Sequence, residues 1–288
     1  MASIDSPTFH RAFLAAEPLD VEIELGSGAV IVTAADVDEA TVTLSPATAG
    51  DPDALELIDR SRVDLRGKAL RIDVPRVMGF RRHPDVIVEA TVPSGSTIDA
   101  KTGSADVRLD GEYGDVALKS GSGNVSVDQC GDARVTTGSG DVRLGLVQAA
   151  TVKAASGDVS VERSSGDLRL STGSGDVVVQ DAAGTAQLST ASGDVEVGTA
   201  GPELAAKTAS GGISVRHAAE GDIEVRTVSG DVIVAVAPGT ATLLDCTSVT
   251  GAVRSELEPS GEPVDATTKR LTLRARTVSG GISIKRAR

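Results

Sequence analysis

Four aspartates that follow a Ser-Gly pair at regular intervals are the residues of this chain best suited to chemistry. They are Asp141, Asp158, Asp176 and Asp194. Carboxylate oxygens are the ligands that calcium prefers, and nonapeptide repeats rich in Gly and Asp bind calcium in one class of β-roll. If the four side chains lie above one another, roughly 5 Å apart, they form a column of like charges that a cation could bridge. A cation ladder is therefore one hypothesis for this phrase.

The same Ser-Gly-Asp phrase suits a tight turn, and this is our first interpretation of it. Asp accepts hydrogen bonds from nearby backbone amides, and Gly adopts positive φ at little cost. Calcium-binding repeats need a second glycine and an Asp in both halves of each coil, whereas alternate units of this chain often have Ala, Thr or Glu instead. We therefore expect each aspartate to be held by its own turn, and we expect no cofactor.

No other group of residues has the spacing of a catalytic or metal-binding site. The histidines, His10, His83 and His217, are scattered, and neither Gly-x-Ser-x-Gly nor His-Glu-x-x-His occurs. The Gly-Ser-Gly segments are not followed by Lys and Ser or Thr, as a phosphate-binding loop requires. Cys130 and Cys246 are far apart and form no Cys-x-x-Cys pair. These observations predict a protein that is not an enzyme.

Composition excludes several classes of partner. The formal net charge is −13, so the surface as a whole repels nucleic acid and anionic membranes. With three Phe, one Tyr and no Trp, the chain lacks the aromatic platforms that stack bases or sugars. We find neither a basic start followed by an apolar run nor an uninterrupted apolar stretch long enough to span a membrane. We expect a cytoplasmic protein without an integral membrane segment, and peripheral membrane contact stays open.

The last 23 residues are the exception to this acidic composition, because they contain seven basic residues and no acidic one. Charge on a terminal strand keeps a free sheet edge from pairing with another chain, so a solvated, protected edge is our first interpretation. The alternative is docking to an acidic protein partner or to lipid headgroups. The residues that would serve such docking are Arg274, Arg276, Lys285, Arg286 and Arg288.

The phrase recurs because the chain is built from short repeated units. We take the residue before the first apolar position of each unit as a landmark, and the landmarks follow one another at steps of mostly nine residues. Apolar residues stand one and three positions after the landmark, as Val107 and Leu109 do after Asp106. This is the alternation of a strand with one face inward. The full phrase returns every 17 to 19 residues, which predicts coils of two strands with like phrases stacked.

The repeat becomes irregular at both ends, where a stack of coils needs caps. Residues 1–96 contain longer strands, and Asp51 followed by Pro52 predicts the start of a short helix. Residues 97–236 hold the regular repeat, and residues 237–288 include prolines that interrupt it before the last strands. The fold class we predict is an all-β solenoid, a β-helix, in one continuous domain with two irregular caps.

The run of Ser-Gly-Asp-Val phrases, together with the opening IELGSGAVIV and the closing RARTVSGGISI, resembles the DUF4097 family of β-strand repeat proteins, also called toastrack or adhesin-like proteins. The resemblance covers nearly the whole chain. It implies a fold similar to that of surface adhesins and an association with bacterial envelope-stress signalling, and it brings no catalytic residues. We therefore expect a non-enzymatic scaffold or protein-interaction module. The sequence specifies neither its protein partner nor its oligomeric state. The alternative is a calcium- or cation-binding β-roll.

Overall fold

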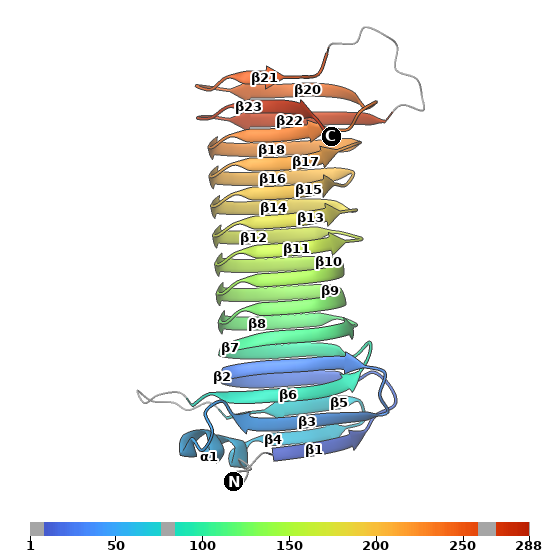
Figure 1. The fold of residues 1–288 in the computed structure, drawn as a ribbon, viewed down its shortest axis with the longest axis vertical. Coiled ribbons are helices and arrows are strands. Elements are labelled where there is room, and N and C mark those ends of the chain that lie inside the picture. Colours follow the sequence, from blue (N-terminus) through green and yellow to red (C-terminus); the bar gives the residue numbers. More distant parts are fainter. Residues whose placement is uncertain (1–8, 76–83, 259–268, 288) are drawn as a thin grey trace, which may run out of the picture. The chain divides into compact units, whose positions relative to one another are not determined.

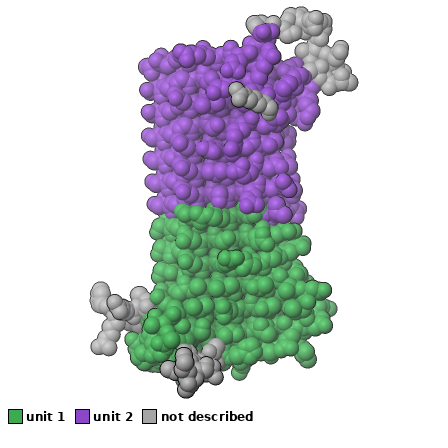
Figure 2. Space-filling view, viewed as in Figure 1, with its two compact units in different colours: residues 1–145 green, residues 146–288 purple. Residues whose placement is uncertain are grey.

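The computed structural model describes residues 9–75, 84–258 and 269–287. His83 and Arg288, which the sequence singled out, lie outside these ranges. Contacts divide the chain into two compact units, unit 1 with residues 1–145 and unit 2 with residues 146–288 (Figure 2). The regular secondary structure of the described residues is nearly all strand, with one short helix. None of the described helices is long and apolar enough to cross a membrane. The division into a repeat and two caps that the sequence suggested stays a prediction.

Unit 2 contains regular two-strand coils (Figure 1). Strand β10 (Val142–Ser156) contains the boundary between the units. One series of strands comprises β12 (Leu168–Ser174), β14 (Thr185–Ser192), β16 (Glu203–Ser210) and β18 (Gly221–Ser229), and the other comprises β11 (Val159–Ser164), β13 (Val177–Ala182), β15 (Val195–Ala200), β17 (Ile213–Ala218) and β19 (Val232–Val236). Within each series the neighbours pair in parallel, Val159 with Val177 and Leu168 with Ala186. The predicted solenoid with about eighteen residues per coil is confirmed.

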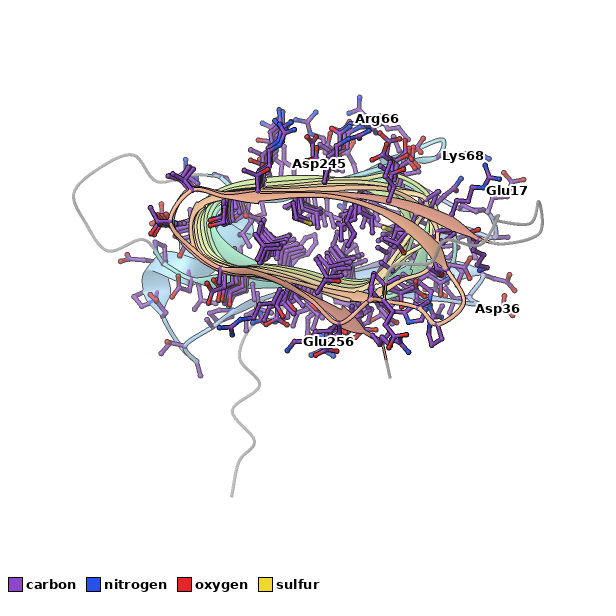
Figure 3. All side chains as sticks on the ribbon, turned by 90° about the horizontal axis from the view of Figure 1, so that it is seen from above. Glu17, Asp36, Arg66, Lys68, Asp245 and Glu256 are labelled. Atoms are coloured by element: carbon purple, nitrogen blue, oxygen red, sulfur yellow. The ribbon has the colours of Figure 1, made fainter. Side chains whose placement is uncertain are left out.

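The interior of the coils is thin and aliphatic. Figure 3 shows carbon side chains inside the coils and nitrogen and oxygen atoms on the outside. The inward positions of the predicted register are buried: Val159 and Val161 on one side and Leu168 and Leu170 on the other are at most 1% exposed. The threonines four residues before the landmarks form a second buried column, which comprises Thr172, Thr190, Thr208 and Thr227. Such a narrow core is filled by branched aliphatic residues and needs no aromatic side chain.

Unit 1 contains the same kind of coil around two long strands, β2 (Asp20–Ala35) and β7 (Thr97–Tyr113). They pair in parallel from Asp20 with Thr97 to Thr33 with Asp110. Strands β8 (Val116–Ser122) and β9 (Val125–Ser139) continue the parallel pairing with β7. Strands β5 (Ala69–Asp73) and β6 (Val86–Pro93) also pair with β2 in parallel. The longer strands that the sequence predicted for this part of the chain are therefore present.

The remaining elements of unit 1 pair in the antiparallel sense. Strand β1 (Phe9–Leu14) pairs with β3 (Glu39–Pro46), β3 pairs with β6, and β4 (Arg62–Arg66) pairs with β5. The predicted helix is α1 (Pro52–Arg60). The carboxylate of its N-cap, Asp51, accepts a hydrogen bond from the backbone N–H of Asp53 at 3.0 Å, which satisfies an amide that has no partner within the helix.

The last strands of unit 2 are not stacked in sequence order. Strands β20 (Ala241–Ser248) and β21 (Val253–Ser255) come first in the chain, but β22 (Arg270–Thr277) pairs with both β18 and β20. Likewise β23 (Ile282–Arg286) pairs with both β19 and β21. Among the described strands, the terminal coil of unit 2 is therefore β20–β21 (Figure 1).

This order corrects our first interpretation of the basic segment, because β22 and β23 are not at the edge. The reason lies in their inward side chains: Leu273 and Ile284 are at most 1% exposed, which requires a coil on each side of them. On β20 the inward Leu244, which pairs with Leu273, is only half-buried. The basic residues therefore lie on the outside of an inner coil and cannot protect a free edge.

Candidate docking surface

The aspartates of the Ser-Gly-Asp corner form a ladder of hydrogen bonds along unit 2. The Oδ1 atom of Asp158 accepts a hydrogen bond from the backbone N–H of Asp176 at 2.9 Å. Asp176 accepts from Asp194 at 2.7 Å, and Asp194 accepts from Gly212 at 2.7 Å. The expectation that each aspartate is held by its own turn is wrong, because each side chain points along the stack to the amide of the following coil.

Unit 1 contains the same ladder with an amide side chain in one position. The Oδ1 atom of Asp106 accepts from the N–H of Asn124 at 2.7 Å, and Oδ1 of Asn124 accepts from the N–H of Asp141 at 3.0 Å. Because Asn serves as well as Asp, the ladder needs an oxygen acceptor and not a negative charge. Among the described residues no three His, Cys, Asp or Glu side chains lie close enough together to hold a metal ion. The cation ladder stays a hypothesis, which we test below.

The glycine before each aspartate is required by the backbone. Gly175, Gly193 and Gly211 have φ of +132°, +143° and +144°, a region that strains any residue with a Cβ atom. A Cβ atom on Gly211 would also collide with the carbonyl oxygen of Gly193 in the preceding coil. That carbonyl accepts a hydrogen bond from the buried hydroxyl of Thr208 at 3.0 Å. The Thr-x-Ser-Gly-Asp phrase is thus engaged in holding neighbouring coils together.

The structure separates the basic residues that the sequence grouped. Arg274 and Arg276 lie on β22, in one series of strands, whereas Lys285 and Arg286 lie on β23, in the other. Figure 3 shows Asp245 and Glu256 on opposite faces of the coils. All three of these arginines have acidic partners, and that of Arg286 is Glu258 at 4.0 Å.

Arg274 donates to Asp222 at 2.9 Å and Arg276 to Asp245 at 3.4 Å. These pairs are exposed, so each is worth little to stability and leaves the arginine accessible.

A stripe of exposed valines lies next to Arg276, and sequence reasoning missed it. The stripe comprises Val228, Val278 and Val249, which are 55%, 47% and 70% exposed. Each valine directly follows an inward Thr or Ser, and backbone bonds join successive members: Ser279 N–H donates to Val228 at 2.9 Å, and Thr250 N–H donates to Val278 at 3.1 Å. At this position the other coils have Gly103, Gly121, Gly138, Ala155, Gly173, Ala191 and Ala209. The signal was present in the sequence as the phrases TVSG, TVSG and SVTG.

A row of basic side chains accompanies the valine stripe. Lys207, Arg226 and Arg276 stand two residues before the stripe position, and the strand register places Arg226 beside both Lys207 and Arg276. Arg226 pairs with Glu224 of its own strand. The valines and the basic row line one shallow groove. We call these six residues, Val228, Val249, Val278, Lys207, Arg226 and Arg276, the docking surface.

The two thiols are poorly suited to chemistry. Burial, with the nearby carboxylates of Asp132 and Asp115 adding to it, raises the pKa of the Cys130 thiol to about 12. Burial also raises the pKa of the Cys246 thiol. Because the thiolate is the nucleophile and the metal ligand, neither side chain is activated at neutral pH.

Comparisons with known proteins find one matching family and several similar solved structures. A family model described as Toastrack DUF4097 matches residues 19–286, and a search of curated proteins finds no match. A candidate adhesin from Parabacteroides distasonis is similar at 12% identity, with 97% of this chain and 98% of that chain covered and a TM-score of 0.47. A candidate adhesin from Bacteroides fragilis is 14% identical, with 97% and 98% covered and a TM-score of 0.35.

A candidate lipid-binding protein from Parabacteroides distasonis is also similar, at 14% identity, with 97% of both chains covered and a TM-score of 0.37. The family model spans nearly the whole sequence and includes the coils described above. The chain therefore belongs to the Toastrack DUF4097 family.

Proposed function

We propose that this protein is a non-enzymatic interaction module that binds a protein partner at the docking surface. The observation that carries this proposal is the exposed valine stripe. Seven other coils have Gly or Ala at the same position, so the fold does not require a larger side chain there. Contiguous exposed apolar residues beside polar ones are typical of interaction sites.

The side chains of the docking surface indicate which kind of protein partner would bind there. Its basic row favours acidic side chains beside an apolar stripe, because complementary charges steer and orient association. Valines of successive coils are spaced by about 4.8 Å, whereas residues three or four apart on an α-helix are spaced by roughly 4.5–6 Å along its axis. Alternate residues of an extended strand are about 6.6 Å apart and fit less well. The partner we propose is an amphipathic helix with apolar residues at i, i+3 and i+7 and acidic residues beside them.

Other partner classes fit less well. A net charge of −13 opposes binding to nucleic acid or to an anionic membrane. An association with bacterial envelope-stress signalling and a cytoplasmic location, both expected at the level of sequence, belong to this proposal. An adhesin-like role would use the same surface. The aspartate ladder offers no specific observation in favour of the cation-binding alternative, because its Oδ1 atoms already accept backbone hydrogen bonds.

Affinity capture from the native host with quantitative mass spectrometry tests the proposal. The baits are the native chain, Val228→Asp within the docking surface and Ile233→Asp as a matched control. Ile233 is also an outward aliphatic residue, 37% exposed, on the strand series opposite the stripe. We expect a protein that the native chain and Ile233→Asp capture equally and that Val228→Asp loses at least tenfold.

Equal capture by both variants would contradict the proposed surface. Phosphatidylglycerol vesicles provide a second arm: if the native chain binds them and Val228→Asp does not, the surface serves a membrane and the proposal of a protein partner is wrong.

A further inference from the structure

The terminal coil of unit 2 has a backbone edge that is open among the described residues. Strand β20 pairs with β22, and β21 pairs with β23. The N–H group of Ala241 donates to the carbonyl of Lys269, directly before β22, at 2.9 Å, and that of Val249 donates to the carbonyl of Thr277, the last residue of β22, at 3.3 Å. Along a parallel strand, alternate residues direct their N–H and C=O groups to opposite sides. The odd-numbered residues from Ala241 to Val249 therefore face β22, and the even-numbered residues between Ala241 and Val249 direct these groups to the open side. Such an edge is a template for another strand.

The apolar core is also open at this coil. Leu244 and Cys246 face inward but are half-buried, whereas Leu273, which pairs with Leu244, is 0% exposed. On the other side of the coil Val253 is 47% exposed, and its partner Ile282 is 1% exposed. One further layer would remove this inward-facing apolar surface from water, which is favourable.

Strand β20 lacks the devices that usually prevent pairing, and β21 carries one charged residue, Arg254. Strand β20 contains no Lys and no Pro, and its one charged residue, Asp245, already pairs with Arg276 of its own chain. By contrast β4, which pairs only with β5 among the described strands, carries Arg62, Asp64 and Arg66 in five residues. Charged residues on an edge strand resist pairing with a further strand. The sequence therefore protects the edge at β4 and does not protect the edge at β20.

We propose that two copies of this chain associate end to end, with the terminal coil of one meeting the terminal coil of the other in an antiparallel, isologous contact. A single foreign strand would cover β20 or β21 and leave the core between them open. A second terminal coil has the same cross-section and offers both strands and a matching apolar opening, as a two-fold contact requires. Since Asp245 is compensated within each chain, the β20 strands of the two copies do not repel each other.

The contact area between the two copies is small, so the dimer should be weak. Strand β20 has eight residues and β21 has three, fewer than the roughly 20–30 residues a side of a standard interface. We therefore expect a reversible dimer whose population rises with protein concentration.

Sedimentation velocity from low to high micromolar concentration tests this dimer, with a reductant present so that a Cys246 disulfide cannot mimic it. The native chain should shift from monomer to dimer. Thr242→Pro removes an N–H on the open side and leaves the bonds to β22 intact, and Leu243→Lys places a charge at a residue of the edge that is 68% exposed. Each should raise the dissociation constant at least tenfold without lowering the melting temperature.

Val228→Asp is the matched control, because Val228 lies on β18, which is separated from β20 by β22. It should leave the dimer unchanged while it removes partner capture, so the two proposals can fail separately. A native chain that is monomeric at every concentration would overturn the proposal. So would a dimer that both folded edge variants leave intact.

Discussion

Asp176 and Asp194 occupy the same corner of successive coils, and the Oδ1 atom of Asp176 accepts a hydrogen bond from the backbone N–H of Asp194 at 2.7 Å. This relationship recurs at intervals of 17 or 18 residues in both units. It gives the repeated aspartate a structural role, because an exposed side chain is fixed to the next coil. The ladder, the glycine backbone and the buried threonines together explain why the phrase repeats so closely.

Adjacent glycines at one corner should respond in opposite ways to substitution. Gly211 has φ of +144° and no space for a Cβ atom, so Gly211→Ala should lower the free energy of unfolding by roughly 2–4 kcal/mol. Gly212 stands where other coils have Asp or Asn, and a Cβ atom on it would lie 3.3 Å from the carbonyl oxygen of Asp231, a tight contact that needs only a small shift. Gly212→Asn should extend the ladder and raise that free energy by about 1 kcal/mol. Urea unfolding followed by circular dichroism measures the free energy of unfolding of both variants. A similar loss of that free energy in the two variants would contradict the proposed ladder.

Two buried threonines should also differ. Thr190 donates its hydroxyl to the carbonyl of Gly175 at 3.0 Å, so Thr190→Val leaves that acceptor without its partner and should cost about 1–2 kcal/mol. The hydroxyl of Thr102 is buried and has no hydrogen-bond partner among the described residues. Thr102→Val keeps the shape and removes an unsatisfied group, so we expect a higher midpoint of urea unfolding. A loss of stability in Thr102→Val would show that its hydroxyl has a partner in solution.

The inward register is tested on β11. Val159 is 0% exposed, so Val159→Asp places a charge in a dry core and should cost several kcal/mol, on the order of 3–5. Ser160 points outward from the same strand, and Ser160→Asp should leave the melting temperature nearly unchanged. Equal effects at these neighbours would mean that the register is wrong.

Alkaline pH should weaken the fold through buried acids that stay protonated. The pKa of Cys130 is raised from an ordinary value of 9.0 to about 12, so ionisation favours the unfolded chain. The stabilising contribution is complete below about pH 9 and is lost as pH rises toward 12. Burial raises the pKa of Tyr113 in the same direction. The urea midpoint should fall between about pH 9 and pH 11, and it should fall less in Cys130→Val. An identical fall in both proteins would exclude Cys130 as a cause.

Much of the fold followed from local pattern. Alternating apolar residues and the spacing of Ser-Gly-Asp predicted the coil, the inward register and the stacking of like phrases, because each depends on neighbours within one repeat. The helix at Pro52 followed from its cap. The order of the last strands did not, since β18 pairs with β22 across 50 residues, Ile223 with Leu273. Such non-local pairing leaves no local signal once the period is interrupted.

The candidate site was less predictable. The sequence identified the aspartate column but not the hydrogen bonds that its side chains accept. An Asp side chain can accept from an amide of its own turn or from an amide of the next coil, and the sequence is the same in both cases. Arg274 and Lys285 were grouped by their closeness in sequence, whereas strand alternation places them on opposite series of strands. The valine stripe was readable, since its three phrases are alike, but its significance depends on knowing that β22 lies between β18 and β20.

The melting temperature in millimolar calcium and in chelator tests most directly whether the aspartate ladder is structural. A cation that bound only the folded coil would, at a hundredfold excess over its dissociation constant, add about 2.7 kcal/mol per site. We predict no difference between the two conditions, and we predict that Asp158→Asn combined with Asp176→Asn keeps the native melting temperature, because Asn124 already accepts the same bond. A saturable stabilisation by calcium that this double substitution abolishes would contradict the account and establish the ladder as a cation site.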